Sequence, residues 1–264
     1  DGANGLYLYG ISFPYNIAKD ILLNKLKVND HIEVNNHSYV NSYCEKAEKI
    51  TNNSQNYLGI ASTIAKDIGD KQWANKVYKK AEQKAEDYSD LSELVGSIIY
   101  DLGDKEWAKK IYKKAEAVAE TSVNFQFLAA SIAENIGDKE WAKKVYKKSE
   151  ENTTEYSDFL YLADSINENL KDKKWVKAIY EKLDSSGEDW SPLNDLACEI
   201  YHKLGDKEWA KKVYKNAEEN AENSDDYEGL AESIRENLGD KKWAKALDKK
   251  AKELEEEDDD EDDD

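Results

Sequence analysis

The sequence predicts an all-α protein, built as a solenoid of helix pairs. The first observation is a set of tryptophans, each 34 positions after the last (107 − 73 = 34, for example), at Trp73, Trp107, Trp141, Trp175, Trp209 and Trp243. Such a fixed period is typical of repeat architectures. The second is composition, because the 264 residues include only two prolines and twelve glycines and many good helix formers. The third is helical spacing of apolar residues inside each period.

Residues 1–36 come before the repeats and do not follow this spacing. In this segment, 5–13 (GLYLYGISF) indicates a strand or an extended strip. The stretch 14–26 indicates an amphipathic helix that begins at Pro14, with its inward positions at Ile17, Ile21, Leu22 and Leu26. We expect residues 1–36 to be either an irregular N-terminal cap over the first repeat or the remnant of an upstream domain.

Residues 37–258 are predicted to form the solenoid. A partial repeat is followed by six full units, at 55–88, 89–122, 123–156, 157–190, 191–224 and 225–258. Each unit holds two helical patterns. In the third unit the first pattern is Phe125, Leu128, Ala129, Ile132 and Ile136, and the second is Trp141, Ala142, Val145 and Tyr146.

A Gly-Asp pair separates the two helices of most units, as at Gly137 and Asp138. Glycine takes the left-handed conformation that ends the first helix, and aspartate caps the second helix. Lys171 replaces this glycine in the fourth unit, where a side chain is expected to cost about 1 kcal/mol. Asn35, which tolerates this conformation better, stands at the corresponding place before the first unit.

The run LSELVGSIIYDLGDKEWAKKIYKKAE at 91–116 resembles the tetratricopeptide repeat (TPR) and the related half-a-TPR repeat. It contains a small residue in the first helix (Gly96, with Ala130 and Cys198 in sister units), the Gly-Asp turn, and Ala108, Tyr112 and Ala115 in the second helix. A Trp opens the second helix instead of the first, and the helix-ending proline of the family is absent. The resemblance, which covers about 37–258, implies a right-handed superhelix that binds peptides or partner helices on its concave face.

The charge and the cysteines exclude several classes of function. The formal net charge is −19, and residues 253–264 contribute eleven of the acidic groups, which leaves −8 for the rest. This balance argues against nucleic-acid binding and favours basic proteins or peptides as partners. Cys44 and Cys198 fit neither a disulfide framework nor a zinc site.

No apolar run approaches the ~20 residues of a membrane helix, so we expect no membrane partner. The free cysteines and the absence of a visible signal favour the cytoplasm, but the sequence begins at Asp1 without a methionine, so localisation stays unknown. Catalytic motifs of the HExxH, GxSxG and Walker types are missing, and the histidines are His31, His37 and His202. We predict that the protein is not an enzyme and that it needs no cofactor or metal.

The second helix of each unit is nearly constant, so specificity is predicted to lie in the first helix. We interpret the tryptophans and Tyr78, Tyr112, Tyr146, Tyr180 and Tyr214 as packing between helices, against the alternative of a ligand groove. The expected concave binding face is made of Glu93, Ser97, Tyr100, Phe127, Ser131, Glu134, Tyr161, Ser165, Glu168, Glu199, His202 and Lys203.

An aromatic strip of Tyr100, Phe127 and Tyr161, flanked by acids, suits a partner with apolar and basic residues. The alternative is that Phe127 packs against a neighbouring helix and that Tyr161 is half-buried.

Trp190, which is out of register with the other tryptophans, either staples two units or forms an exposed contact. Ser191 is expected to cap a helix with Pro192 in its first turn.

The lysines that recur along the second helices allow three interpretations, namely a solvated face with pairs such as Glu106 to Lys110, a site for an anionic partner, or a site for the protein's own acidic segment. That segment, 255–264, is predicted to be disordered.

The leading functional hypothesis is a protein-binding adaptor or scaffold. One alternative is a structural protein that self-assembles through the solenoid ends or through contact of the acidic tail with the lysines. Another is a recognition arm of a larger enzyme or regulator.

Overall fold

The structure is a computed structural model that describes residues 5–8, 11–14, 37–186 and 189–261. The chain divides into two compact units. Unit 1 comprises residues 1–120 and 134–138, and unit 2 comprises residues 121–133 and 139–264. Each unit is described by itself.

Unit 1 contains a β-hairpin and five α-helices in its described part. Strands β1 (Gly5–Leu8) and β2 (Ile11–Pro14) are antiparallel, with Leu6 opposite Phe13, so the strand interpretation of 5–13 is correct. The helix expected at 14–26 does not begin at Pro14, because this residue is the last of β2. The rest of that helix, 15–26, and the turn expected at Asn35 lie outside the described residues. The helices of unit 1 are α2 (His37–Ile50), α3 (Ser54–Thr63), α4 (Lys71–Lys84), α5 (Tyr88–Ser97) and α6 (Lys105–Val118).

Unit 2 contains eight α-helices among its described residues. They are α7 (Ser122–Ser131), α8 (Lys139–Asn152), α9 (Tyr156–Leu170), α10 (Lys173–Ser186), α11 (Trp190–Glu199), α12 (Lys207–Glu219), α13 (Ser224–Ser233) and α14 (Lys241–Glu261). A short π-helical turn continues α3, α5, α7, α11 and α13, and these turns are η1 (Ile64–Ile68), η2 (Ile98–Leu102), η3 (Ile132–Ile136), η4 (Ile200–Leu204) and η5 (Ile234–Leu238).

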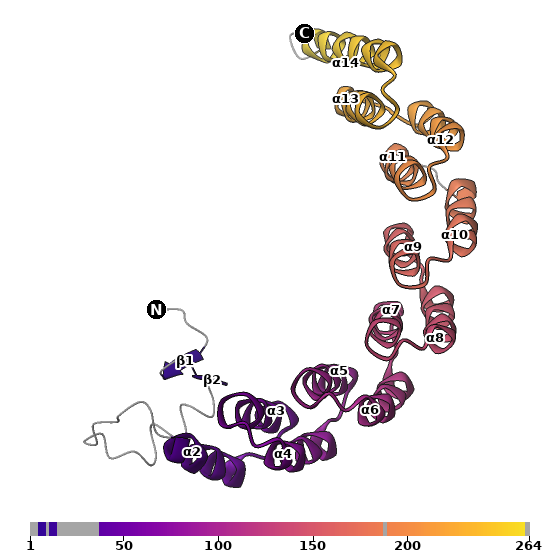
Figure 1. The fold of residues 1–264 in the computed structure, drawn as a ribbon. Helices are drawn as coiled ribbons and strands as arrows, with labels where there is room; N and C mark the ends of the chain where they lie inside the picture. Colours follow the sequence, from indigo (N-terminus) through magenta and orange to yellow (C-terminus); the bar gives the residue numbers. More distant parts are fainter. Residues whose placement is uncertain (1–4, 9–10, 15–36, 187–188, 262–264) are drawn as a thin grey trace. The chain divides into compact units, whose positions relative to one another are not determined.

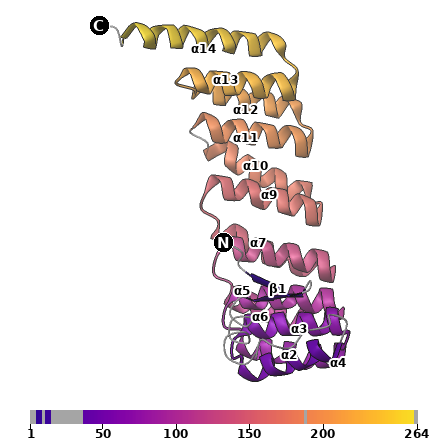
Figure 2. The ribbon, with the colours of Figure 1, turned by 90° about the vertical axis from the view of Figure 1, so that its left-hand side faces the viewer.

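Consecutive helices pack as antiparallel pairs, which confirms the predicted all-α helical-repeat solenoid. The pairs are α3 with α4 and α5 with α6 in unit 1, and α7 with α8, α9 with α10, α11 with α12 and α13 with α14 in unit 2. In unit 2 the first helices of the pairs form one layer and the second helices form the other (Figure 1). Figure 2 shows the first helices α9, α11 and α13 lying side by side along this layer.

Most of the residues that the helical periodicity predicted to face inward are buried, whereas Ile136 and Trp141 of the third repeat are half-buried. Phe125, Leu128 and Ile132 of one first helix are at most 8% exposed, and Val145 and Tyr146 of the helix that follows are fully buried. Because each pair has one apolar stripe on each of its helices, it buries these stripes only by packing against its neighbours.

The Gly-Asp turns have the predicted conformation. The five turn glycines Gly69, Gly103, Gly137, Gly205 and Gly239 have φ between 67° and 79°. The aspartate that follows the glycine accepts a backbone N–H bond from the new helix, as Asp104 does from Trp107 at 2.9 Å. Lys171, at φ 59°, is the one non-glycine residue with a positive φ among the described residues. It follows α9, which ends without the π turn of the other first helices.

Replacing Lys171 with glycine is expected to raise the free energy of unfolding by up to about 1 kcal/mol, because glycine removes the Cβ from a left-handed backbone. Chemical denaturation followed by circular dichroism measures this change. Ala178→Gly, at an exposed position inside α10, is the matched control and is expected to lose about 1 kcal/mol. A loss of stability in both variants would contradict the prediction.

Two expected element boundaries are wrong. Helix α14 continues to Glu261, so the part of the acidic segment 255–261 that was expected to be disordered is helical. Buried Ala244, Leu247 and Ala251 anchor this helix, and glutamate propagates a helix well once it is nucleated. Residues 262–264 lie outside the described residues.

The N-cap of α11 also differs from the expectation. Asp189, and not Ser191, precedes the helix, and its side chain makes no capping bond. Pro192 does lie in the first turn, where several positions tolerate proline because the backbone N–H groups there have no partner within the helix. The proline therefore indicated the helix start but not the residue at which it begins.

Candidate binding surface on the first helices

A buried tyrosine in each of the second helices α4, α6, α8, α10 and α12 bonds to the polar face of a first helix. Tyr146 is fully buried, and its hydroxyl lies 2.7 Å from Ser165 Oγ and accepts a bond from Asn169 Nδ2 at 3.1 Å. Tyr214 accepts from Asn237 Nδ2 at 2.9 Å, and Tyr78 donates to Asp101. These tyrosines pack as predicted, and their hydroxyls are used within the protein.

The tryptophans hold neighbouring second helices together. The indole N–H of Trp107 donates to Glu82 at 2.8 Å, and Lys114 contacts the same carboxylate at 2.7 Å. The same indole-to-carboxylate bond joins Trp73 to Glu48, Trp175 to Glu150, Trp209 to Asp184 and Trp243 to Glu218. The indole N–H groups of these tryptophans are bonded within the protein, and their rings are buried or half-buried. They therefore have the packing role that the sequence predicted.

Some of the lysines that recur along the second helices form ion pairs within the protein. Lys114 is paired as above, and Lys143 forms an ion pair with Asp172 at 2.6 Å. Glu106 pairs with Lys109 at 3.3 Å, three residues on, whereas Lys110 was the expected partner. Lys110, Lys113, Lys144 and Lys147 are exposed.

Trp190 acts as a staple inside unit 2. Its side chain is half-buried, and its Cη2 atom lies 3.0 Å from the place where a Cβ atom on Gly229 would be. The indole of α11 therefore packs on the bare backbone of α13, the neighbouring first helix. This confirms the staple interpretation over the exposed contact.

The two layers of unit 2 carry opposite charge. The described first helices at 156–170, 190–204 and 224–238 contain ten acidic and two basic residues, and the second helices α8, α10 and α12 contain thirteen basic and eight acidic residues. Both basic residues of the first helices are paired inside the unit. Lys203 contacts Asp164 and Glu199, and Arg235 contacts Asp248 at 2.7 Å. The surface of these three first helices is therefore acidic, whereas the remaining first helix of unit 2, α7, contains no charged residue.

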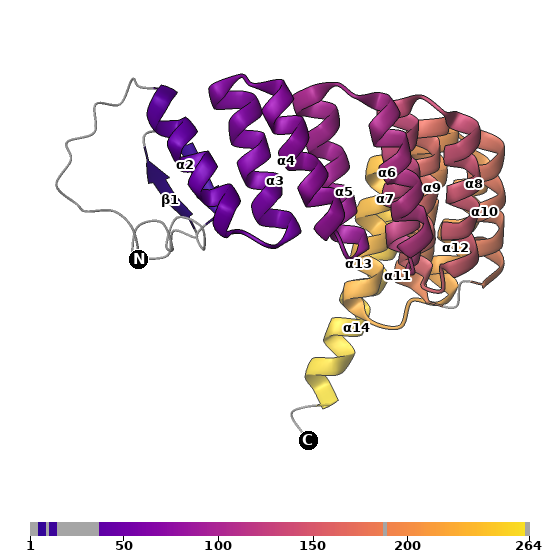
Figure 3. The same ribbon diagram turned by 90° about the horizontal axis from the view of Figure 1, so that it is seen from below.

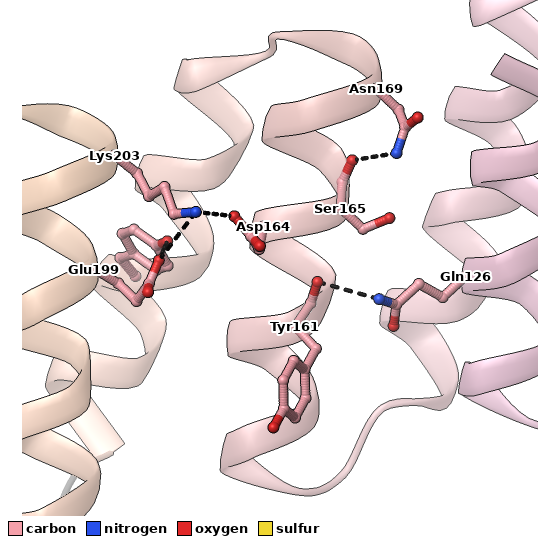
Figure 4. Close-up of polar contacts among 8 residues, drawn as sticks. Gln126, Tyr161, Asp164, Ser165, Asn169, Glu199 and Lys203 are labelled. Atoms are coloured by element: carbon pink, nitrogen blue, oxygen red, sulfur yellow. Dashed lines mark hydrogen bonds and ion pairs between the residues drawn. The ribbon is translucent and has the colours of Figure 1, made fainter. Parts of the chain in front are cut away.

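Two large aromatic side chains stand exposed on neighbouring first helices of unit 2. Phe127 on α7 is 63% exposed and Tyr161 on α9 is 68% exposed. The two helices are in contact, and Gln126 Nε2 donates to the carbonyl oxygen of Tyr161 at 3.1 Å (Figure 4). The sequence allowed either an exposed Phe127 or a Phe127 that packs against a neighbouring helix. The structure shows the exposed side chain.

Tyr100 is the corresponding exposed aromatic of unit 1, at 82% exposure. Lys66 Nζ lies 5.0 Å from the centre of its ring and 3.4 Å from Asp101. This stacked lysine keeps one face of the ring covered by a cation.

Among the predicted contact residues, Ser165, Glu199 and Lys203 are half-buried and have partners inside unit 2. Ser165 bonds to Tyr146, Glu199 accepts from Tyr180 at 3.4 Å, and Lys203 bridges Asp164 and Glu199 (Figure 4). Burial raises the pKa of Glu199, although Lys203 opposes this. The bond to Asp164 raises the pKa of Lys203.

The other predicted residues are more accessible. Glu93, Glu134, Glu168 and His202 are exposed, and Ser97 and Ser131 are half-buried. His202 lies 2.9 Å from Asn237 Oδ1. Of the predicted set, the accessible groups on the first helices of unit 2 are thus Phe127, Tyr161, Glu168 and His202.

Sequence reasoning missed two residues of this surface. Asp164 occupies the position of Gly96, Ala130 and Cys198, which the resemblance marked as a small packing residue. A charged residue at a position that the family reserves for a small packing residue was the signal in the sequence that this position is accessible to solvent. Gln126, which fixes the spacing of α7 and α9, carried no signal of its own.

The resemblance to the TPR marks the position of Gly96 as one that requires a small residue. The packing around Gly96 does not require one. A Cβ atom there would have no neighbour within 4 Å, so this part of the resemblance has no counterpart in the packing of α5.

Searches against known proteins identify no relative. No protein-family model matches the chain, and no curated protein matches it. Within the described residues, no cluster of three or more His, Cys, Asp or Glu side chains is arranged to hold a metal ion. In that same part of the chain, none of the helices is both long and apolar enough to span a bilayer.

Proposed function

We propose that this protein is a TPR-like scaffold without catalytic activity, which binds a basic and apolar segment of a partner protein on the first-helix surface of unit 2. The observation that carries the proposal is the exposure of Phe127 and Tyr161 on neighbouring first helices, of which α9 has acidic and no basic residues. Large exposed aromatics are common anchors of protein interfaces. An acidic surround favours a cationic partner and disfavours nucleic acid and anionic membranes.

The helix-pair repeat, the Gly-Asp turn and the recurring Ala and Tyr of the second helix support the TPR-like assignment. This array differs from the TPR in the Trp at the start of the second helix, whose indole bonds to a carboxylate of the preceding second helix. The same surface would serve a recognition arm of a larger enzyme or regulator equally well.

The spacing of the two anchors suggests the form of the partner segment. Phe127 and Tyr161 occupy equivalent positions on adjacent helices, whose axes are separated by about 8–10 Å. A polyproline-II segment rises about 9 Å in three residues and returns to the same face. We therefore expect apolar partner residues at i and i+3, flanked by lysine or arginine that faces the exposed Glu168.

The Ala substitutions Phe127→Ala and Tyr161→Ala test this proposal. Random peptides are first selected on the wild-type protein, and the affinities of the selected peptides are then measured by fluorescence anisotropy. Each substitution is expected to weaken binding by about 10- to 100-fold without changing thermal stability. The selected peptides are expected to be rich in aromatic and basic residues and to bind more weakly at high salt.

Val118→Ala is the matched control, because Val118 is an exposed apolar residue on a second helix, at 40% exposure. It is expected to leave binding unchanged. Selected peptides that bind the double variant as tightly as the wild type would place the binding surface elsewhere.

A further inference from the structure

The exposed aromatics of unit 2 belong to a row of equivalent positions that continues onto α11. Phe127 and Tyr161 are one repeat apart (161 − 127 = 34), and the next step of the same length (195 − 161 = 34) reaches Asp195. Helix α9 contacts both α7 and α11, which keeps these positions next to one another. Figure 3, like Figure 1, shows the first helices α9, α11 and α13 on one side of unit 2 and the second helices α8, α10 and α12 on the other. Asp195 therefore lies on the same layer as the two aromatic anchors.

Asp195 is an exposed carboxylate that no cation neutralises. Within the described residues it forms no ion pair, whereas Asp164 and Glu199 on the same layer share Lys203. The protein around the Asp195 carboxyl group displaces water from it and raises its pKa, and a hydrogen bond from Asn194 opposes this only in part. A cation supplied by a partner would remove this cost.

The groups next to Asp195 add no positive charge. The hydroxyl oxygen of Tyr156 and the Oδ1 atom of Asp184 are buried and have no hydrogen-bond partner among the described residues. The other oxygen of Asp184 accepts from the Trp209 indole at 2.9 Å. Burial raises the pKa of Tyr156, and the charges of Asp184 and Asp195 raise it further, which places its hydroxyl close to both carboxylates. The surroundings of Asp195 are therefore negative.

The row ends at α13. The equivalent position there (195 + 34 = 229) is Gly229, and the Cη2 atom of Trp190 lies 3.0 Å from the place where its Cβ atom would be. Because the indole covers this position, α13 offers no side chain of its own there. Phe127, Tyr161 and Asp195 thus form a row of three.

We propose that Asp195 selects a basic residue of the partner segment, three residues beyond the apolar residue that packs on Tyr161. This inference rests on the function proposed above and adds the place of the charge. Adjacent first helices lie about 8–10 Å apart, and a polyproline-II segment rises about 9 Å in three residues. The row therefore reads positions i, i+3 and i+6 of the partner as apolar, apolar and basic.

Asp195 is in this way a specificity-determining residue. The two aromatic anchors accept any segment with apolar residues at i and i+3, whereas the carboxylate rejects an acid at i+6, because like charges would meet. Arginine is expected to be preferred to lysine at i+6, because a planar guanidinium bonds a carboxylate through two N–H groups at once.

Two labelled peptides test the role of Asp195. They are extended sequences with phenylalanine at i and i+3, and they differ only at i+6, where one has arginine and the other glutamate. Each is also made in the reverse order, because the row can be read in either chain direction. Fluorescence anisotropy with the full chain is expected to show about 10-fold tighter binding of the arginine peptide. Asp195→Lys is expected to invert this preference, and Asp195→Asn to reduce it.

Two controls separate this contact from a general attraction between a basic peptide and an acidic protein. In a third peptide the arginine is moved to i+7, which points to another face of a polyproline-II segment. Asp195→Lys is expected to weaken the binding of this peptide less than that of the i+6 peptide. Glu151→Lys makes the same change in net charge at an exposed position of α8 and is expected to leave the preference unchanged. Circular dichroism shows that each variant is folded.

An arginine preference that survives Asp195→Lys, or an equal effect of this variant on the i+6 and i+7 peptides, would overturn the role of Asp195. If Phe127→Ala still weakens both peptides in that case, the function proposed for the surface stands. A wild type that binds none of the peptides would contradict that function, and this inference with it.

Discussion

Raising the pH above about 10 is expected to unfold the helical repeats in a steep transition. Burial raises the pKa of Tyr78, Tyr146, Tyr180 and Tyr214 above the ordinary value for tyrosine. Nearby Asp101 raises the pKa of Tyr78 further, and Glu199 does the same for Tyr180. Each of these rings must therefore stay neutral in the folded protein.

The direction of the pH effect follows from these shifts. A tyrosine whose folded pKa lies above its unfolded value of about 10 contributes its full stability below that pH, and the contribution is lost as the pH rises. Each such group removes about 1.4 kcal/mol per pH unit, so four together remove about 5–6 kcal/mol per unit. A domain with a stability of about 5–15 kcal/mol then unfolds within a few pH units.

Circular dichroism and tyrosinate absorbance, recorded during the same alkaline titration, measure this transition. The buried tyrosines are expected to ionise together with the loss of helix. In the control, Tyr180→Phe with Tyr214→Phe, the pH dependence of the stability is expected to be less steep, because two of the buried tyrosines no longer ionise. Complete ionisation near pH 10 with intact helices would show that the rings are accessible and the account is incorrect.

Replacing Tyr146 with alanine is expected to lower the free energy of unfolding by about 4 kcal/mol. The ring is fully buried and meets Trp175 edge to face, with 6.4 Å between the ring centres. Removing it leaves a cavity and takes a partner from Ser165 and Asn169. Because repeats contact only their neighbours, the cavity also weakens the coupling between the pairs α7 with α8 and α9 with α10.

Urea unfolding followed by circular dichroism measures this loss and the broadening of the transition. Tyr161→Ala removes the same side chain from an exposed position on α9, and is expected to change stability by less than about 0.5 kcal/mol. Tyr146→Phe isolates the hydroxyl, at about 1–1.5 kcal/mol. Equal effects of the two alanine substitutions would contradict the assignment of Tyr146 to packing and Tyr161 to the surface.

Most of the fold could be predicted because its signals are local. The apolar spacing of Phe125, Leu128 and Ile132 specifies a helix face within one turn of each residue. A glycine at a left-handed position and an aspartate after it specify where helices end and begin. The same local rules gave an incorrect start for α11 and an incorrect end for the last helix, because several residues near a helix end satisfy them equally well.

The candidate binding surface was only partly predictable. The sequence placed Phe127 and Tyr161 on one stripe, but exposure and packing of Phe127 had equal support. Ser165 and Lys203 were predicted as partner contacts, and the structure gives them the partners Tyr146 and Asp164. Nothing local distinguishes a polar residue that faces solvent from one that meets a tyrosine of the preceding pair, 19 residues away in the case of Tyr146 and Ser165.

By itself, the sequence determined the helix-pair repeat, its period, its turns, the packing of its tryptophans and the burial of its recurring tyrosines, because these depend on backbone conformation and on apolar stripes that recur along the chain. The tertiary structure alone decided which polar residues join one helix pair to the next and that the side chains of Phe127 and Tyr161 remain exposed. These outcomes depend on contacts between helices, and such contacts are set by how the side chains of two helices fit together rather than by the spacing within either one.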